Sequence, residues 1–542
     1  MEIPSGEISD FMKNKTYINS GAYDCITIIA SAAQEIPGVI CIRSGNFVKD
    51  KQFRYSKCEL FTVDLQKEKT FQISMQDVKV CYCYLFKRGS SAPIQQINLK
   101  DGAEDTPSVV YKNQNVFHYS APTGWLNDPV GLCFYHGLYH MFYQFNPASQ
   151  KWGDAHWGHV TSRDLLHWRE HPVVFCPQPE LISTPLVRGG AFSGTALVEQ
   201  ERLHLFFTRH VGDLQKKHCM EYTVTADSVD GFSFSEERTI VKDLPSELGE
   251  NFRDPKVWRE GDEWLMLTGT ETPEGAAIAI HRSKDLTTWE YRGIFYREKE
   301  RGYLRAECPS IIKISGKYVL IVGYHNREKE KIRRDTVYYI GSFENYRFHV
   351  EHKGLLDYGK DFYAAQIFAG LERAVLIAWV NDRHEYHIEK LCRSNGAMSL
   401  PRKLWIEEER LYSYPTEELV LAETKEACFT GPFTLKDGRG HLHFDFTEEP
   451  SGTAVFAGSE SGRVSVTVSK NRIQITMDDE TCGLETDLQE LDVYLDNSLL
   501  EIFINHGMYA FTRRYERYET NYEVNAAFEP GCRAAFYKIE PL

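Results

Sequence analysis

Four short segments of the chain repeat one pattern, and their spacing constrains the fold more than any other feature of the sequence. They read SRDLLHW, SVDGFSF, SKDLTTW and SFENYRF, and they begin at Ser162, Ser228, Ser283 and Ser342. Each has a serine, an acidic residue two positions later and an aromatic residue four positions after the acid. A motif that recurs about every 60 residues is typical of a radial repeat, with one copy in each blade of a β-propeller.

The text between the copies supports this interpretation. Apolar residues gather in short runs such as RLHLFFTRH, EWLMLTG and YVLIVGYH, which are typical of β-strands. A fifth unit fits residues 355–415. We expect the serine and the acid of each copy to satisfy the backbone of a turn, and the aromatic residue to pack against the next blade. The sequence therefore predicts a five-bladed β-propeller.

The flanking segments predict two further β-rich units, so the expected fold is all-β. Residues 1–110 contain strand-like stretches and predict an N-terminal accessory domain, interpreted as a small sandwich. The propeller is expected over 111–415. A linker follows over 416–428, and the stretch YPTEELVLAET at this junction carries helical spacing. Residues 429–542 alternate clearly enough to predict a C-terminal β-sandwich.

Charge and composition exclude several classes of partner. The formal net charge is −15, and no basic run offsets it, so we expect no nucleic acid and no anionic membrane as a partner. The N-terminus shows no secretory signal, no window of 18 apolar residues exists, and the 13 scattered cysteines suit reduced thiols. These features predict a cytoplasmic protein, whose oligomeric state stays open and includes a homo-oligomer.

No cofactor and no metal are expected. His136 and His140 are four residues apart, and His156 and His159 are three apart, but the first pair lies in text that reads as a turn and a strand. We interpret these histidines as structural. No glycine-rich loop for a phosphate is present in the sequence.

Three acidic residues stand beside prolines at the start of strand-like runs. They are Asp128 in WLNDPVG, Asp254 in NFRDPKVW and Glu307 in RAECPS. Proline cannot donate to a sheet ladder and is found on edge strands or at strand starts. Because the innermost strand of every propeller blade is an edge strand, three such sites in three blades should converge on one axis. Carboxylates in apolar surroundings should also have displaced pKa values and serve in acid/base chemistry.

The motifs WLNDPVG, FRDP and AECP, in this order, resemble the three signature motifs of glycoside hydrolase family 32. This family contains invertases, levanases, exo-inulinases and sucrose-6-phosphate hydrolases. Further similar text includes AFSGTAL, DYGKDFYAAQIF, GAMSLPRKL and DNSLLEIFINHG. The resemblance covers residues 112–542 and leaves the first 110 residues outside. It implies a five-bladed propeller with a C-terminal sandwich, and a retaining hydrolase that releases fructose from small β-fructoside substrates.

The resemblance also implies a role for each acid. Asp128 matches the nucleophile, Glu307 the general acid/base, and Asp254 the residue that stabilises the transition state. Retention by double displacement needs the first two carboxyls about 5 to 5.5 Å apart. On this basis we expect Asp128 to be ionised and Glu307 to hold a proton near neutral pH, so their surroundings should push the two pKa values apart.

Seven substrate-binding residues carry over from the same resemblance. They are Trp125, Asn127, Gln144, Trp152, Phe192, Ser193 and Arg253. Trp152 has an alternative interpretation as blade packing, and Gln144 as a satisfied strand amide. Arg253 and Asp254 are adjacent and would point to opposite faces of a regular strand, so both reach one pocket only through a local distortion near Pro255.

Two departures from the family pattern leave the function partly open. Val130 stands where the family usually has asparagine, and Ala306 where it has an aromatic residue, which we expect to alter the region just beyond the fructose unit. A fructosyltransferase that uses the same intermediate is therefore an alternative to the hydrolase. An inverting relative that acts on arabinan or xylan and an inactive sugar-binding protein are weaker alternatives. The linkage, β-2,1 or β-2,6, and the use of a phosphorylated substrate stay open.

Overall fold

A computed structural model of the chain is almost entirely β-strand, which confirms the predicted all-β class. Among the described residues the strands form nine sheets, antiparallel except for one short parallel pair, and one short helix, α2 (Glu417–Leu421), lies within the predicted helical stretch. In the part of the chain that the structure describes, no helix is long and apolar enough to span a bilayer. The described residues are 14–21, 23–55, 59–65, 69–86, 95–97, 99, 115–121, 124–147, 150–153, 155–177, 187–213, 218–299, 302–328, 331–381, 394–435, 438–446, 448–457, 464–477, 480–515, 522–529 and 532–539.

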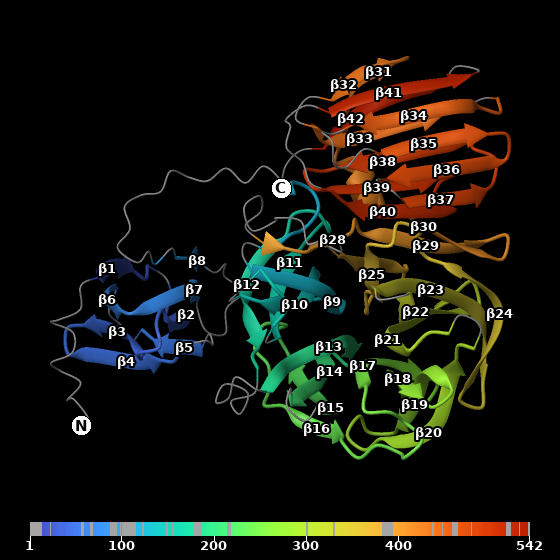
Figure 1. The fold of residues 1–542 in the computed structure, drawn as a ribbon. Helices are drawn as coiled ribbons and strands as arrows, with labels where there is room; N and C mark the ends of the chain where they lie inside the picture. Colours follow the sequence, from blue (N-terminus) through green and yellow to red (C-terminus); the bar gives the residue numbers. More distant parts are fainter. Residues whose placement is uncertain are drawn as a thin grey trace.

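Five sheets follow one another along the middle of the chain, and we number them in that order (Figure 1). Sheet 1 holds β9 (Gly124–Tyr135), β10 (Leu138–Asn146), β11 (His156–Ser162) and β12 (Arg169–Phe175). Sheet 2 holds β13 (Val187–Glu199), β14 (Arg202–Asp213), β15 (His218–Ser228) and β16 (Arg238–Val241). Sheet 3 holds β17 (Phe252–Glu260), β18 (Glu263–Thr272), β19 (Gly275–Ser283) and β20 (Glu290–Arg297).

The last two of these sheets complete the series. Sheet 4 holds β21 (Arg305–Ile314), β22 (Lys317–Glu328), β23 (Lys331–Glu344) and β24 (Arg347–Leu355). Sheet 5 holds β25 (Phe362–Ile367), β26 (Val375–Val380), β28 (Ala397–Met398), β29 (Arg402–Glu407) and β30 (Arg410–Pro415). Within each sheet the chain mainly runs as an antiparallel meander, so its first strand is an edge strand.

The first strands of the five sheets meet in a closed ring. Each first strand contacts the first strand of the next sheet, in the order β9, β13, β17, β21 and β25, and β25 contacts β9 again. Closure is reinforced by β27 (Ser394–Asn395), which follows β26 in the chain and pairs in parallel with β9 of sheet 1. Residues 270 positions apart in the sequence are thereby held side by side, and the edges of all five sheets face one centre.

Each first strand carries a β-bulge, where two residues lie opposite one residue of the neighbouring strand. The bulged pairs are Asn127 and Asp128, Phe192 and Ser193, Asp254 and Pro255, Cys308 and Pro309, and Ala364 and Ala365. In three of the strands the first residue of the pair has a positive φ, which is 62° at Asp254, 49° at Cys308 and 53° at Ala364. A bulge bends a strand and re-aims its side chains, so the bulge residues of each first strand depart from the strict alternation of a regular strand.

The repeat motif forms the turn between the third and fourth strands, as its serine and acid predict. In the first copy the Asp164 carboxylate accepts hydrogen bonds from the backbone N–H groups of Leu166 and His167, and the Ser162 hydroxyl accepts one from Asp164. The second and third copies repeat these bonds.

The predicted packing of the aromatic residue against the next blade is wrong. In sheet 2, Phe234 packs against Phe142 of sheet 1, and in sheet 3, Trp289 packs against Phe206 of sheet 2. The turn between the third and fourth strands lies over the preceding sheet. Its aromatic residue therefore packs against that sheet and not against the next one.

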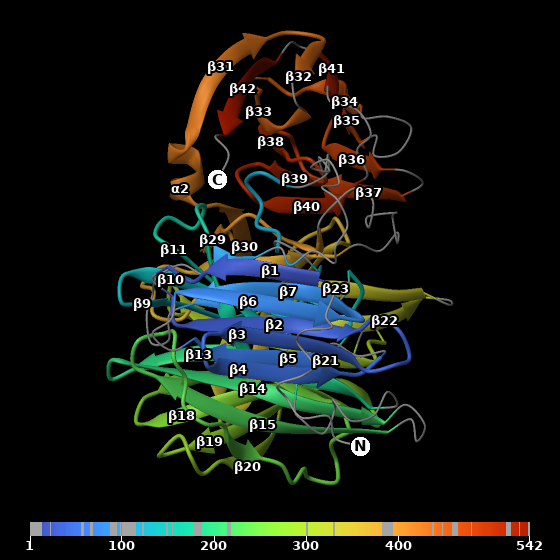
Figure 2. The ribbon, with the colours of Figure 1, turned by 90° about the vertical axis from the view of Figure 1, so that its left-hand side faces the viewer.

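Two four-stranded sheets precede the ring and enclose one apolar cluster. One sheet contains β1 (Asn14–Asn19), β6 (Thr70–Gln76), β3 (Gly38–Ser44) and β4 (Phe47–Phe53). The other contains β5 (Glu59–Asp64), β2 (Cys25–Ala32), β7 (Val78–Phe86) and β8 (Gln95–Gln96). These sheets lie beside sheet 1 (Figures 1 and 2), and the ring of Tyr82 meets that of Phe145 edge-on at 5.9 Å.

Two six-stranded sheets follow the ring and pack around a second large apolar cluster. One contains β31 (Glu423–Phe429), β42 (Arg533–Ile539), β33 (Gly440–Asp445), β38 (Glu490–Leu495), β39 (Leu499–Ile504) and β40 (Tyr509–Arg514). The other contains β32 (Phe433–Leu435), β41 (Tyr522–Glu529), β34 (Ser451–Ala457), β35 (Val464–Ser469), β36 (Arg472–Met477) and β37 (Glu480–Glu485).

A buried arginine joins sheet 5 to these C-terminal sheets. The Arg402 guanidinium, on β29, donates to Glu501 on β39 at 2.6 Å and to Asp357 at 3.0 Å, and also to the Thr512 hydroxyl. All the side chains of this ion-pair network are fully buried, and the guanidinium lies over the ring of Phe362. The ring and the C-terminal sheets are therefore locked by charge as well as by apolar packing.

Replacing Arg402 tests how much this network contributes. Arg402→Leu removes the arginine partner of buried Asp357 and leaves buried Glu501 with His118 alone, and removal of one partner from such a group costs on the order of 3–5 kcal/mol. We expect a loss of this size in the free energy of unfolding measured with urea. Arg259→Leu is the matched control, because Arg259 pairs with Glu199 on the surface and its loss should cost less than about 1 kcal/mol. Equal effects of the two changes would contradict the account.

Candidate active site

The structure brings Asp128, Asp254 and Glu307 together at the centre of the ring, from β9, β17 and β21. Cys308 connects them. Its backbone N–H donates to Asp254 Oδ2 at 2.8 Å, and its thiol lies 3.4 Å from the same oxygen and 3.7 Å from Asp128 Oδ2. Because Glu307 precedes Cys308, three carboxyls from three sheets surround one bulge.

Two neighbours hold the Asp128 carboxylate. The Ser193 hydroxyl donates to Oδ2 at 2.6 Å, and the Asn127 amide donates to Oδ1 at 3.1 Å. Burial raises the pKa of Asp128; these two hydrogen bonds lower it, and the charge of Glu307 raises it further, so the pKa lies above its usual value. The bulge in β13 directs the Ser193 side chain at this oxygen, so a strand of sheet 2 supports an acid of sheet 1.

Asp254 occupies the most restricted position of the three acids. Its side chain is buried, its φ of 62° lies in the left-handed region, and its backbone N–H donates to the Thr208 hydroxyl. A non-glycine residue in that region costs roughly 1–3 kcal/mol and is held there by its surroundings. Burial first, and then the charge of Glu307, raise the pKa of Asp254 to about 8.

Glu307 is held by three donors. Arg253 Nη1 lies 3.1 Å from Oε1, while the Tyr363 hydroxyl at 2.8 Å and His325 Nε2 at 2.7 Å both meet Oε2. Burial raises the pKa of Glu307, but the hydrogen bond and charge of His325 and the charges of Arg253 and Arg305 lower it more, so the pKa lies well below its usual range.

The expectation that Glu307 holds a proton near neutral pH is therefore wrong for this arrangement. The apolar neighbours in the sequence, Ala306 and Cys308, do not set the pKa of Glu307. Cationic and hydroxyl side chains from other strands set it instead. The two pKa values are displaced, but in the direction opposite to the predicted one.

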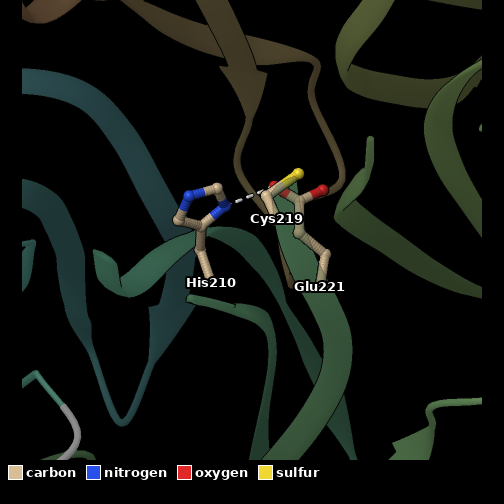
Figure 3. Close-up of side chains that lie close together, drawn as sticks. All are labelled: His210, Cys219 and Glu221. Atoms are coloured by element: carbon tan, nitrogen blue, oxygen red, sulfur yellow. Dashed lines mark hydrogen bonds and ion pairs between the residues drawn. The ribbon is translucent and has the colours of Figure 1, made fainter. Parts of the chain in front are cut away.

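A buried glutamate fixes the arginine of the site. Glu221 on β15 accepts from Arg253 Nη2 at 2.7 Å and from the Phe252 backbone N–H at 2.6 Å. His210 Nδ1 meets the same carboxylate at 2.7 Å (Figure 3). Burial raises the pKa of Glu221, but Arg253 and His210 lower it below its usual value, so it stays an anion and a fixed counter-ion for Arg253.

Cys219 lies beside this pair, and the three side chains have the atom types of a metal site (Figure 3). The Glu221 oxygens already bind Arg253 and the backbone, however, and a divalent cation there would face the guanidinium. We interpret the cluster as the support of Arg253. A second such cluster, His441, His443 and Asp492, lies among the C-terminal strands, where the carboxylate pairs with both imidazoles.

The residues predicted to bind substrate fall into two groups. Asn127, Ser193 and Arg253 contact the acids directly. Trp125 supports them, because its indole N–H donates to the Asn127 side chain at 2.9 Å. The predicted distortion near Pro255 is present, since the bulge lets adjacent Arg253 and Asp254 both face the site.

The remaining three predicted residues are placed as follows. Gln144 is buried, and its amide nitrogen donates to the Ala191 carbonyl, as its alternative interpretation proposed. Trp152 is 46% exposed and meets Phe192 edge-on, so it is not blade packing. Phe192 stacks on His210 at 4.2 Å and lies under the Arg253 guanidinium.

Val130 and Ala306 do not border the site. Val130 is fully buried in the apolar cluster between sheets 1 and 2, and Ala306 in the cluster between sheets 3 and 4. The expected effect of these side chains on the region beyond the fructose unit is not supported, because both pack between neighbouring sheets.

Sequence reasoning did not single out His325, Tyr363 or Glu221. Tyr363 stands in the recognised text DYGKDFYAAQIF, and Gly323 leaves room for its ring, since a Cβ there would meet the ring atoms at 2.9 Å. His325 ends the strand text YVLIVGYH and lies two residues beyond Gly323, the partner of Glu307. Only the register of β21 against β22 reveals this neighbour.

Comparison with known proteins identifies relatives in sequence and in fold. Residues 118–415 match the family described as "Glycosyl hydrolases family 32 N-terminal domain". The chain is 30% identical over 453 residues to a sucrose-6-phosphate hydrolase of Zymomonas mobilis, with 73% of this chain and 86% of that protein covered. It is 31% identical to the sucrose-6-phosphate hydrolase of Bacillus subtilis, with 76% and 90% covered.

Solved structures show the same fold. A family 32 glycoside hydrolase of Bifidobacterium adolescentis superposes with a TM-score of 0.86 at 22% identity, and the match covers 97% of this chain and 99% of that one. The likeness of fold thus extends into the first 110 residues. A family 32 β-fructofuranosidase of Bombyx mori matches with a TM-score of 0.70 at 26% identity, covering 80% and 95%.

The fold and the matches define a glycosidase, an enzyme that hydrolyses O-glycosyl compounds. The chain belongs to glycoside hydrolase family 32.

The raised pKa of Asp254 predicts how stability changes with pH. The unfolded chain releases this proton near its ordinary value of 3.8, while the native protein keeps it up to about pH 8. The native state therefore binds the extra proton between these values, and its stability falls as pH rises through this window. Asp254→Asn removes the effect, so the melting temperature of the variant should gain on the wild type between pH 4.5 and pH 8.

Asp262→Asn provides the control for this comparison. Asp262 is fully exposed, and Lys284 lowers its pKa, so its contribution is already complete above pH 4. Its melting temperature should keep a constant difference from the wild type over the same range. A constant difference for Asp254→Asn as well would show that Asp254 does not take up a proton in the native protein.

Proposed function

We propose that the protein is a retaining β-fructofuranosidase that releases fructose from sucrose or short fructo-oligosaccharides through a covalent fructosyl-enzyme. The observation that carries this proposal is the meeting of three carboxyls around Cys308, one held by Ser193 and one by Arg253. The names of the relatives, sucrose-6-phosphate hydrolase and β-fructofuranosidase, support the substrate class.

In the first step, Asp128 attacks the anomeric carbon of the fructosyl unit. The hydroxyl of Ser193 and the amide of Asn127 donate to its oxygens, which stabilises the carboxylate and fixes its orientation. The C2–O bond breaks as Glu307 protonates the leaving oxygen, and Asp128 becomes an ester of the sugar. Asp254 lies beside Asp128 and is placed to bind the sugar hydroxyls as positive charge develops on the ring.

In the second step, Glu307 takes a proton from water, which attacks the same carbon and releases Asp128. Arg253 keeps Glu307 in one place during both steps, because Glu221 and Glu307 hold its guanidinium from two sides. A double displacement of this kind returns fructose with its original anomeric configuration.

We also propose the structural assignments that go with this function. The ring of sheets 1 to 5 is a five-bladed β-propeller over 111–415, preceded by an accessory domain over 1–110 and followed by a linker over 416–428 and a sandwich over 429–542. The buried thiols of Cys41, Cys83 and Cys133 are free, which supports a reducing compartment such as the cytoplasm.

A product assay tests the proposed function. The wild type and Asp128→Asn are incubated with sucrose, sucrose 6-phosphate, 1-kestose, inulin and a levan oligomer. We expect free fructose from at least one of these from the wild type, and a loss of at least about 1000-fold in the variant, because the nucleophile supplies the covalent route. Asp285→Asn is the control, since Asp285 caps a turn on the surface and should leave the rate unchanged.

Three other results would contradict the proposal. New oligosaccharides or anhydrides in place of fructose would identify a fructosyltransferase. Inversion at C2, detected by NMR of the methyl fructoside formed in methanol, would identify single displacement. Binding of these sugars without turnover would identify a sugar-binding protein.

A further inference from the structure

The general acid of the proposed mechanism needs a proton, and its contacts leave Glu307 ionised. Arg253 and Tyr363 each donate one hydrogen bond to it, and His325 Nε2 lies 2.7 Å from Oε2. A carboxylate that accepts several bonds from donors, two of them able to carry charge, does not keep a proton of its own near neutral pH. The proton must therefore come from one of the groups in contact with Glu307.

The three donors differ in how readily their side-chain types give up a proton. Arg253 stays protonated under all working conditions. Burial and the charge of Glu307 raise the pKa of Tyr363 well above its usual value, so the phenol also keeps its proton. An imidazole changes its charge between about pH 5 and 8 in ordinary surroundings. His325 is 14% exposed, and its Nε2 atom lies within hydrogen-bond distance of Glu307 Oε2.

We propose that His325 carries the proton that Glu307 delivers to the leaving oxygen, so that the two side chains act as one acid/base unit. This inference rests on the proposed function of the same site. His325 touches Glu307 and not the reacting atoms, so it is a positioning residue that works through the acid.

The charges around the pair determine where its proton is held. Arg305 on β21 and Arg334 on β23 lie directly opposite His325 in register, and both oppose a positive imidazole. Glu307 favours it from 2.7 Å. The other facing groups are Arg253 from β17, Tyr363 from β25, and the carboxyls of Asp128 and Asp254, whose contacts are described above. The imidazole thus lies between one carboxylate that attracts a positive charge and two guanidinium groups that repel it.

The proton balance of each step is closed. In the first step, the proton moves from His325 Nε2 to Glu307 and from Glu307 to the leaving oxygen, which keeps the electron pair of the broken C2–O bond. His325 is then neutral and Glu307 ionised. In the second step, water gives its proton to Glu307 as its oxygen bonds to C2, and Asp128 leaves with the electron pair of the ester. The proton returns to His325, and the pair regains its starting charge.

Two substrates and two substitutions of His325 separate this role from a structural one. Sucrose has a poor leaving group that needs the proton, whereas 4-nitrophenyl β-D-fructofuranoside has a leaving group that departs without it. We would measure kcat/KM of the wild type, His325→Gln and His325→Asn on both substrates from pH 4.5 to pH 8.5. His352→Gln is the matched control, because His352 lies on the outermost strand of the same sheet and pairs with exposed Glu409.

The wild type must first release fructose from sucrose, which tests the proposed function separately. Each His325 variant should then lose at least about 100-fold on sucrose and less than about 5-fold on the nitrophenyl substrate. On sucrose, the pH above which kcat/KM of the variant falls should also be lower than in the wild type, because Glu307 must then hold its own proton beside Arg253 and Arg305. Equal losses on the two substrates, or no change in the pH of this fall, would overturn the inference. Activity on the nitrophenyl substrate also shows that the variant has folded.

Discussion

The site depends on the interruption of backbone pairing in the first strand of each ring sheet. A strand in regular pairing sends neighbouring side chains to opposite faces, so one strand could offer only alternate residues to the centre. At each bulge two residues lie opposite one partner, and Arg253 with Asp254, or Glu307 with Cys308, can then serve the same site. The backbone strain at Asp254 and Cys308 is the local cost of this arrangement. The closed ring and the buried Arg402 network supply the rigidity that maintains it.

The surroundings of the three carboxyls, which would repel one another if all were ionised, shift their pKa values in different directions. Burial raises the pKa of both aspartates, and each is steadied by a different donor: Ser193 for Asp128 and the Cys308 backbone for Asp254. Glu307 is the one that receives cationic neighbours. Glu221 extends the series outward, because it fixes Arg253 in the position where it can neutralise Glu307.

Much of this architecture could be read from the sequence, and the reasons are physical. The Ser-x-acid turn recurs because every sheet closes the same kind of connection, and the acids stand beside prolines because both belong to edge strands. The direction of the aromatic packing could not be read, since it depends on the tilt of one sheet over another. The same is true of Val130 and Ala306, whose side chains pack between neighbouring sheets.

The charged and polar partners of the site residues could not be predicted from the sequence either. His325 and Glu221 meet the site from second and third strands, where only register and sheet tilt decide which residues face the acids. The prediction for Glu307 failed for this reason. Its neighbours along the chain are weakly polar, whereas its neighbours in space are a histidine, a tyrosine and an arginine.

The most direct test of the account is to trap the covalent intermediate. Glu307→Ala with 4-nitrophenyl β-D-fructofuranoside should form the ester without an acid and then stall, because no base activates water. After rapid acid quenching and proteolysis, mass spectrometry should find one fructosyl unit on the peptide that contains Asp128. An unlabelled Asp128 peptide, with nitrophenol released at a steady rate and no initial burst, would contradict the assignment of Asp128 as nucleophile.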